Sequence, residues 1–193
     1  MTTLPISLHT ICGLDELEGH GGRGVTHVLS ILDPDWPDPE AFGAYDPHHR
    51  TVLRFHDAIE PAPGIVLPEP EHVDTILDFG RSLAGGPAER EGHLLVHCHM
   101  GISRSTAAMA MLLAQGSPGE DEDSLLARLV EIRGQAWPNL RMIEFADERL
   151  DRGGRLVAAL GRLYRRQLTS GQHLGEVMRR HNRGREVDLA ERS

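Results

Sequence analysis

Residues 93–115 read HLLVHCHMGISRSTAAMAMLLAQ. The apolar run that ends at His97 is typical of a buried strand, and the alanine-rich run over residues 105–115 is typical of a helix packed closely on a sheet. The short loop between them begins with Cys98 and leads to Arg104. A loop that opens a helix directs backbone amides toward one point, where the helix N-terminus adds partial positive charge. The sequence therefore predicts an anion-binding loop.

The side chains of this loop suit chemistry on a phosphoryl group. Cys98 at the floor of such a loop is favoured as a thiolate, which makes it a candidate nucleophile. Arg104 can donate two parallel hydrogen bonds to phosphate oxygens, which lysine cannot do. Gly101 allows the backbone to turn its amides inward. The hydroxyl of Ser105 is placed to donate to the sulfur when sulfur becomes the leaving group.

Strands alternate with helices around this stretch, which predicts an α/β fold. A Pro-rich loop is expected over residues 33–49, and a helical turn over residues 14–20. We expect a central, largely parallel sheet of four to five strands flanked by helices. The predicted strands are 4–12, 25–32, 51–56 and 93–97, and the predicted helices are 73–83, 105–115, 124–132, 141–150 and 156–168.

Length and composition indicate one domain. We expect residues 1–168 to form it, with one hydrophobic core. Residues 169–193 are polar and rich in glycine and arginine, so we expect a frayed, flexible tail. The tail arginines Arg179, Arg180, Arg183 and Arg185 are interpreted as solvated.

Charge and cysteine content indicate which partners and which cellular compartment suit the protein. The net charge of −9 disfavours nucleic acid and anionic membranes as partners. With only two cysteines, Cys12 and Cys98, no disulfide framework is possible, which favours a reducing compartment. No targeting segment and no membrane span is expected, so the sequence indicates a cytoplasmic protein. It does not indicate an oligomeric state.

His97 to Ser105 resembles the signature of the protein tyrosine phosphatase superfamily, His-Cys-x5-Arg-Ser/Thr. Residues 25–32 are similar to a strand of dual-specificity phosphatases, and Arg133 with residues 137–139 is similar to their later Arg…Pro-Asn segment. The resemblance covers about residues 6–150. The loop also resembles that of a compact group of bacterial proteins identified as tyrosine phosphatases.

The resemblance implies a phosphatase fold of the dual-specificity type and hydrolysis of phosphate monoesters through a phosphocysteine. It further implies that His97 tunes the loop by hydrogen bonds and that Asn139 supports it. Phosphate is bound by the loop itself, for which the candidate residues are His99, Met100, Gly101, Ile102, Ser103 and Arg104.

The leaving oxygen needs a proton, and two carboxylic acids compete for that role. Asp38 lies in a Trp-Pro-Asp sequence like the one that names the acid loop of larger tyrosine phosphatases, but it follows the first central strand. Asp57 ends the next strand, with one helix between it and Cys98. The family's acid usually ends the strand beside the cysteine strand, and sites gather at the carboxyl ends of parallel strands. We therefore favour Asp57 over Asp38.

No metal and no organic cofactor is expected. His93, His97 and His99 flank the cysteine, but their spacing matches no zinc pattern well, and a closed zinc site would consume the thiolate. Cys12 is interpreted as a small core residue, with a redox role toward Cys98 as the alternative.

Three functions are compared. The first is a cysteine-dependent phosphatase acting on phosphotyrosine or phosphoproteins, or on a small non-protein phosphate. The second is a module that binds phosphorylated partners without turnover, and the third is a rhodanese-like sulfur carrier. The Arg104-Ser105 pair and an available acid favour the first. The absence of lysine from the loop disfavours inositol phospholipids as substrates.

Overall fold

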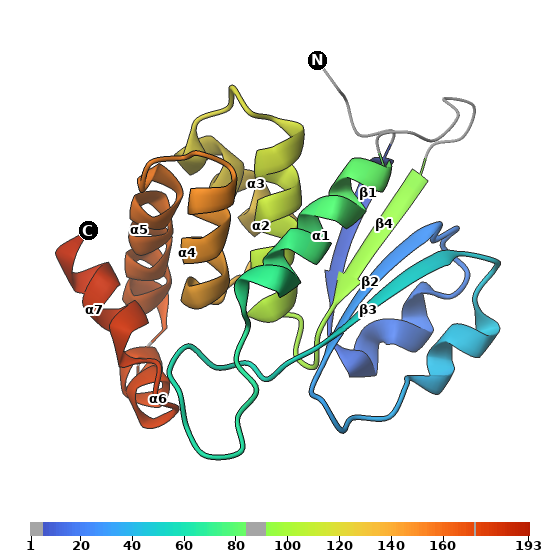
Figure 1. Ribbon diagram of the computed structural model, residues 1–193, viewed down its shortest axis with the longest axis horizontal. Helices are drawn as coiled ribbons and strands as arrows, with labels where there is room; N and C mark the ends of the chain where they lie inside the picture. Colours follow the sequence, from blue (N-terminus) through green and yellow to red (C-terminus); the bar gives the residue numbers. More distant parts are fainter. Residues whose placement is uncertain (1–5, 84–91, 172) are drawn as a thin grey trace.

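A parallel sheet of four strands forms the centre of the molecule (Figure 1). The computed structural model describes residues 6–83, 92–171 and 173–193. The strand order is β1-β4-β2-β3, and every neighbouring pair runs parallel. The predicted α/β architecture is confirmed. The first strand is expected from the sequence to begin at residue 4, which lies outside the described residues. The strands are β1 (Ile6–Cys12), β2 (His27–Leu32), β3 (His49–Arg54) and β4 (Gly92–His97).

Helices cover the two faces of the sheet unequally. The α-helices lie on one side, while the two short 3-10 helices, η1 and η2, lie on the other (Figure 1). The bounds are η1 (Leu14–His20), η2 (Glu40–Ala44), α1 (Pro70–Leu83), α2 (Arg104–Gly116), α3 (Glu122–Ile132), α4 (Leu140–Arg149), α5 (Arg155–Ser170), α6 (Leu174–Arg180) and α7 (Gly184–Arg192). None of the helices in the described part of the chain combines the length and apolarity that crossing a membrane requires.

The main core lies between the sheet and the α-helices, and β4 and α2 are its centre. Every residue of β4 is buried, because β1 and β2 flank this strand and helices cover it. In α2 all residues from Arg104 to Ala114 are buried, and small alanine side chains let the helix approach the sheet closely. The loop of residues 98–103 therefore joins two strongly buried elements, β4 and α2.

The segment after residue 168 differs from the predicted frayed tail, because it forms α6 and α7. Val187 and Ala190 of α7 are buried, and α7 packs against α5. The approach is close at Gly161 of α5, where a Cβ atom would lie 2.0 Å from Ser193 Oγ. Overall composition misled the prediction, since the few apolar residues fall on one helical face.

Candidate active site

Cys98 lies directly after β4, at the start of the loop that leads into α2. Its Sγ atom lies 3.2 Å from Ser105 Oγ, within hydrogen-bond distance. Only 2% of Cys98 is exposed to solvent, yet it lines a cavity that opens to the surface. The sulfur is thus shielded from bulk water and accessible from one side.

The loop carbonyls are bonded away from the cavity. Each carbonyl oxygen from His99 to Ser103 accepts a hydrogen bond from outside the loop. The donors are the Leu14 amide for residue 99, the Arg133 guanidinium for residues 100 and 101, the Trp137 amide for residue 102, and the Ala107 and Asn139 amides for residue 103. Among the described residues, no hydrogen bond uses a loop amide of residues 99–103 as donor. The amides are therefore left for an anion.

Gly101 has a backbone conformation that other residues adopt only with strain. Its φ is +67°, and a Cβ atom there would lie 2.5 Å from the carbonyl carbon of Cys12. The backbone at the end of β1 thus lies so close to the loop that only glycine fits at residue 101. The mid-loop glycine expected from the sequence occupies this point of closest approach.

Arg104 begins α2 and lines the cavity, but part of its guanidinium is already engaged. Its Nη1 donates to Asp33 Oδ1 at 2.6 Å and to the Phe55 carbonyl at 2.6 Å. Its Nε is buried and has no hydrogen-bond partner among the described residues. Buried donors are rarely left unpaired, so this atom is a candidate to bind an anion.

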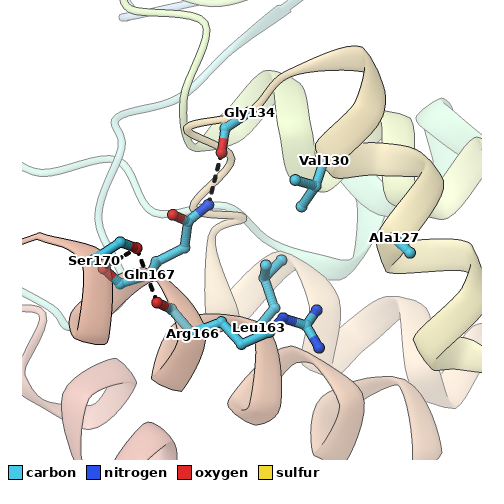
Figure 2. A pocket seen from close by; sticks show the side chains of 7 residues that line it. All are labelled: Ala127, Val130, Gly134, Leu163, Arg166, Gln167 and Ser170. Atoms are coloured by element: carbon cyan, nitrogen blue, oxygen red, sulfur yellow. Dashed lines mark hydrogen bonds between the residues drawn. The ribbon is translucent and has the colours of Figure 1, made fainter.

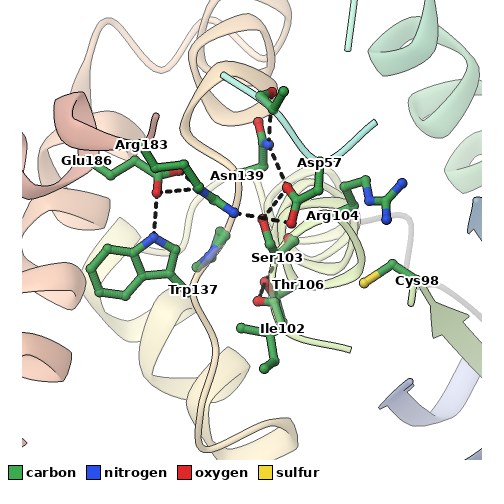
Figure 3. A network of polar contacts seen from close by, with 12 residues as sticks. Asp57, Cys98, Ile102, Ser103, Arg104, Thr106, Trp137, Asn139, Arg183 and Glu186 are labelled. Carbon is green, nitrogen blue, oxygen red and sulfur yellow. Dashed lines mark hydrogen bonds and ion pairs between the residues drawn. The ribbon is translucent and has the colours of Figure 1, made fainter. Parts of the chain in front are cut away.

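Asp57 is the centre of a polar network on the cavity wall (Figure 3). Its Oδ1 accepts hydrogen bonds from Ser103 Oγ at 2.7 Å and from Asn139 Nδ2 at 3.0 Å. Its Oδ2 accepts from Arg183 Nη1 at 3.1 Å. The structure therefore brings Asp57 and Asn139 together with the loop, as the sequence leads one to expect.

Opposing effects act on the proton affinity of Asp57. Desolvation raises its pKa, while the charges of Arg183 and Arg104 and the hydrogen bonds from Asn139 and Ser103 lower it. The net result is a pKa below the usual range for aspartate. In the ligand-free protein Asp57 is a carboxylate.

The two acid candidates occupy different places. Asp38 is exposed and pairs with Arg54 at 2.7 Å, and it is not among the residues that line the cavity. Asp57 does line it. One step of the sequence argument is wrong, because β2 lies between the strand of Asp57 and the cysteine strand. The chain after β3 nevertheless reaches the loop, as the bond from Arg104 to the Phe55 carbonyl shows.

His97 is buried and connects β2 to the start of the loop. Burial lowers the pKa of His97 to about 4, so the ring is neutral at pH 7. Its Nδ1 lies 3.4 Å from the Cys98 carbonyl, and its Nε2 lies 2.6 Å from Ser30 Oγ. An Nδ1–H that donates to this carbonyl leaves Nε2 to accept from the Ser30 hydroxyl. His97 thus restrains the cysteine backbone and does not face the cavity.

The cavity has a volume of about 470 Å³. Apolar side chains and several ionisable groups share its wall. The residues that line it are Asp57, Cys98, His99, Met100, Ile102, Ser103, Arg104, Trp137, Val177, Met178, His181 and Arg183. Of the predicted substrate-binding residues, Gly101 is absent from this wall, because it faces β1 instead.

A second hollow, of about 370 Å³, lies between α3 and α5 (Figure 2). Its lining residues include no cysteine, histidine or carboxylate, and Gln167 Nε2 donates to the Gly134 carbonyl at 2.9 Å inside it. Within the described ranges, no group of three or more metal-ligating side chains is close enough to hold a metal ion. Burial raises the pKa of Cys12 to about 12, which makes that thiol unreactive. The chemistry is concentrated in the cavity at Cys98.

Sequence reasoning missed Asp33 and Arg183. Asp33 directly follows β2, so the rule that sites gather at the carboxyl ends of parallel strands could have found it. Arg183 lies in the segment interpreted as a solvated tail, and no local signal marks it. Only the packing of α7 brings it to Asp57.

Comparison with solved structures identifies similar folds. Human DUSP28 aligns with a TM-score of 0.54 and 15% identity, covering 78% of this chain and 94% of that chain. Tk-PTP in its active form aligns with a TM-score of 0.53 and 18% identity, covering 77% and 95%. PTPMT1 in complex with PI(5)P aligns with a TM-score of 0.50 and 13% identity, covering 75% and 91%. No family model and no curated protein sequence matches the chain. These similarities show a shared phosphatase-type fold.

Proposed function

We propose that this chain is a cysteine-dependent phosphomonoesterase of the protein tyrosine phosphatase superfamily. The observation that carries the proposal is the loop of residues 99–103, whose carbonyls are all bonded outward around the Cys98 sulfur. Inward amides, the start of α2 and the buried Nε of Arg104 supply donors for a phosphoryl dianion. The fold shared with known phosphatases supports the same conclusion.

In the first step the Cys98 thiolate attacks phosphorus in line. The S–P bond forms while the P–O bond to the leaving group breaks, and the loop amides and Arg104 hold the other phosphate oxygens. Asp57, protonated in the substrate complex, gives its proton to the leaving oxygen. A bound phosphate dianion favours this protonation, because a nearby negative charge raises the pKa of a carboxyl group.

In the second step water releases the phosphate. Asp57, now a carboxylate, accepts a proton from the water whose oxygen attacks phosphorus. The P–S bond breaks, and the Ser105 hydroxyl, 3.2 Å from the sulfur, donates a hydrogen bond to the departing thiolate. The cycle ends with inorganic phosphate and with the enzyme in its starting state, without a metal or organic cofactor.

We infer that the substrate is a phosphorylated protein, and that phosphotyrosine fits the site. Trp137, Ile102 and Met178 provide apolar surface on the cavity wall for the organic part of the substrate. A small non-protein phosphate is the alternative substrate. Comparing kcat/KM on phosphotyrosine, phosphoserine and inositol phosphate distinguishes these classes.

One observation favours the second function, binding without turnover. Asp57 is already held as a carboxylate by Arg183, and a carboxylate cannot donate the proton that the first step requires. A protein locked in this state would bind phosphate monoesters at the loop and release them unchanged.

The experiment that separates the two functions measures hydrolysis of an aryl phosphate and of an alkyl phosphate. We expect Cys98→Ser to lose at least about 10³-fold in kcat, because the nucleophile is removed. Asp57→Asn should lose about 10²-fold or more, and the loss should be greater on the alkyl ester, whose leaving group needs the proton more. Asp38→Asn is the matched control and should retain wild-type rates.

Wild-type rates in Cys98→Ser would refute the mechanism. No hydrolysis by the wild type, together with phosphate binding that depends on Arg104, would establish the binding function instead.

A further inference from the structure

Arg183 precedes α7 and connects this helix to the candidate active site. Only 6% of the residue is exposed. Its Nη1 donates to Asp57 Oδ2 at 3.1 Å, and its Nε and Nη2 donate to the two carboxylate oxygens of Glu186 at 2.7 and 2.6 Å. One guanidinium therefore bridges the carboxylate at the cavity to a carboxylate in the interior of the protein.

Glu186 is a rigid anchor for this arginine. It is fully buried, and its oxygens accept hydrogen bonds from Trp137 Nε1 at 2.5 Å and from the Leu140 amide at 3.1 Å. The Tyr164 hydroxyl also donates to it, at 3.3 Å. Because Glu186 is held from several sides, two of the guanidinium nitrogens are fixed, and the third points at Asp57 (Figure 3).

The charges around Arg183 disfavour a role as a second phosphate-binding cation. One positive charge lies between two carboxylates, Asp57 and Glu186, so the cluster of three carries a net negative charge. All three guanidinium nitrogens already donate to a carboxylate, so the N–H groups that remain on Nη1 and Nη2 lie beside negative charge. What the geometry allows Arg183 to change is the state of Asp57.

The hydrogen bonds of Asp57 show where its proton can reside. Oδ1 already accepts from Ser103 and Asn139, so a proton is most easily added at Oδ2. Arg183 donates to one lone pair of Oδ2, and its positive charge disfavours a proton on the other lone pair. The positive charge of the arginine and the proton therefore oppose each other at the same carboxyl group.

Building on the proposed function, we propose that Arg183 is a positioning residue that stabilises Asp57 as a carboxylate and thereby sets the pH range of the proton-donating step. The arginine acts from the segment after α6, outside the part of the chain that resembles the phosphatases in sequence. Its removal should make Asp57 easier to protonate, while Ser103 and Asn139 still hold the carboxyl group in place.

Other charged and titratable groups besides Arg183 lie around Asp57, so the control variant must leave all of them in place. They are Arg104, His99, Tyr164 and His181. Arg185 lies in the first turn of α7, two residues after Arg183, but it is exposed and pairs with Glu60 and Glu144. Replacing Arg185 removes an equal charge from α7 without touching the carboxyl group.

The first test measures kcat on an aryl phosphate against pH. Proton donation requires protonated Asp57, so kcat falls as pH rises through the pKa of Asp57 in the substrate complex. An arginine in contact lowers an aspartate pKa by about one to three units, so Arg183→Met should move this basic limb by at least about one unit toward alkaline pH. Arg183→Lys should stay near the wild type, and Arg185→Met should not shift the limb.

The second test follows the Asp57 carboxyl carbon by NMR titration in the ligand-free protein, with Asp57→Asn identifying the signal. Because Arg183→Met leaves the Glu186 charge buried, Arg183→Met/Glu186→Gln is the variant to use if the single variant does not fold. Asp57 should titrate at higher pH in either variant than in the wild type. Equal titration of Asp57 in wild type and variant overturns the proposal, even if the protein hydrolyses no phosphate ester. Equal shifts in the Arg183 and Arg185 variants overturn it as well.

Discussion

The pairing of Arg104 with Asp33 shows how a single residue can preorganise the proposed anion site. A free guanidinium on the first residue of a helix could rotate toward solvent. The bond to Asp33 Oδ1 at 2.6 Å and the bond to the Phe55 carbonyl fix one end of it. The buried Nε has no partner among the described residues, and these two bonds restrict where it can move. Preorganisation of this kind lowers the entropic cost of binding an anion.

We expect Asp33→Ala to lower kcat/KM on an aryl phosphate by about tenfold, because losing one charge-assisted hydrogen bond of about 1.5 to 3 kcal/mol frees the guanidinium to move. Steady-state kinetics measure the effect. Asp38→Ala removes an exposed carboxylate that pairs with Arg54 and should leave the ratio unchanged. An unchanged or raised ratio in Asp33→Ala would mean that Asp33 does not orient Arg104 productively.

At the scale of the elements, the loop after β4 is shaped by two neighbours that lie far from it in sequence. In the segment between α3 and α4, Arg133, Trp137 and Asn139 donate hydrogen bonds to the loop carbonyls of residues 100–103. The end of β1 leaves no space for a side chain at Gly101. The hydrogen bonds direct the loop carbonyls toward the segment between α3 and α4, and the close approach of β1 requires glycine at residue 101. The shape of the loop, and with it the proposed anion site, thus depends on three segments packed together.

Gly101→Ala should therefore damage both the fold and the loop. A non-glycine residue at positive φ costs about 1 kcal/mol or more, and the contact with Cys12 forces the backbone to move as well, so we expect at least about 2 kcal/mol of lost unfolding free energy. Urea denaturation measures this, and kcat/KM on an aryl phosphate should fall at least about tenfold. Gly119→Ala is the matched control, since a Cβ there meets no atom within 4 Å. Similar stability of the two variants would show that the loop tolerates a side chain at residue 101.

At the scale of the whole molecule, α6 and α7 are part of the domain that carries the site. Val177 and Met178 of α6 line the cavity, and α7 buries Val187, Ala190 and the Glu186 anchor. The segment therefore contributes one wall of the cavity and completes the core beside α5.

Removing residues 172–193 should destabilise the protein. Losing the buried Val187 and exposing the apolar surface beneath α7 should cost at least about 3 kcal/mol of unfolding free energy, because each large buried aliphatic side chain contributes about 1.5 to 3 kcal/mol. Urea denaturation of the shortened and full chains measures the difference. Arg180→Gln, at an exposed position of α6, should not change the unfolding free energy. A shortened chain as stable as the full one would show that α7 adds nothing to the core.

The sequence alone predicted the α/β class, most elements within a few residues, and the proximity of Cys98, Arg104 and Asp57, whose catalytic roles stay predictions. The class and the elements follow from local signals, namely apolar periodicity and glycine in a tight loop, while the position of Asp57 follows from the rule that parallel strands end at one edge, although its strand does not neighbour β4. One short loop separates Cys98 from Arg104 and Ser105 at the start of α2, so the proximity of these residues follows from chain connectivity.

Only the tertiary structure decided the strand order, the pairing of Asp33 with Arg104, and the contact between Arg183 and Asp57. These contacts join residues far apart in the chain, and no local pattern specifies them. The polar composition of residues 169–193 suggested a solvated tail, but burial of Arg183 and Glu186 as a hydrogen-bonded pair allows that segment to pack. Sequence determines which groups are available for chemistry. Long-range packing decides which of those groups meet, because burial and charge pairing depend on the complete fold.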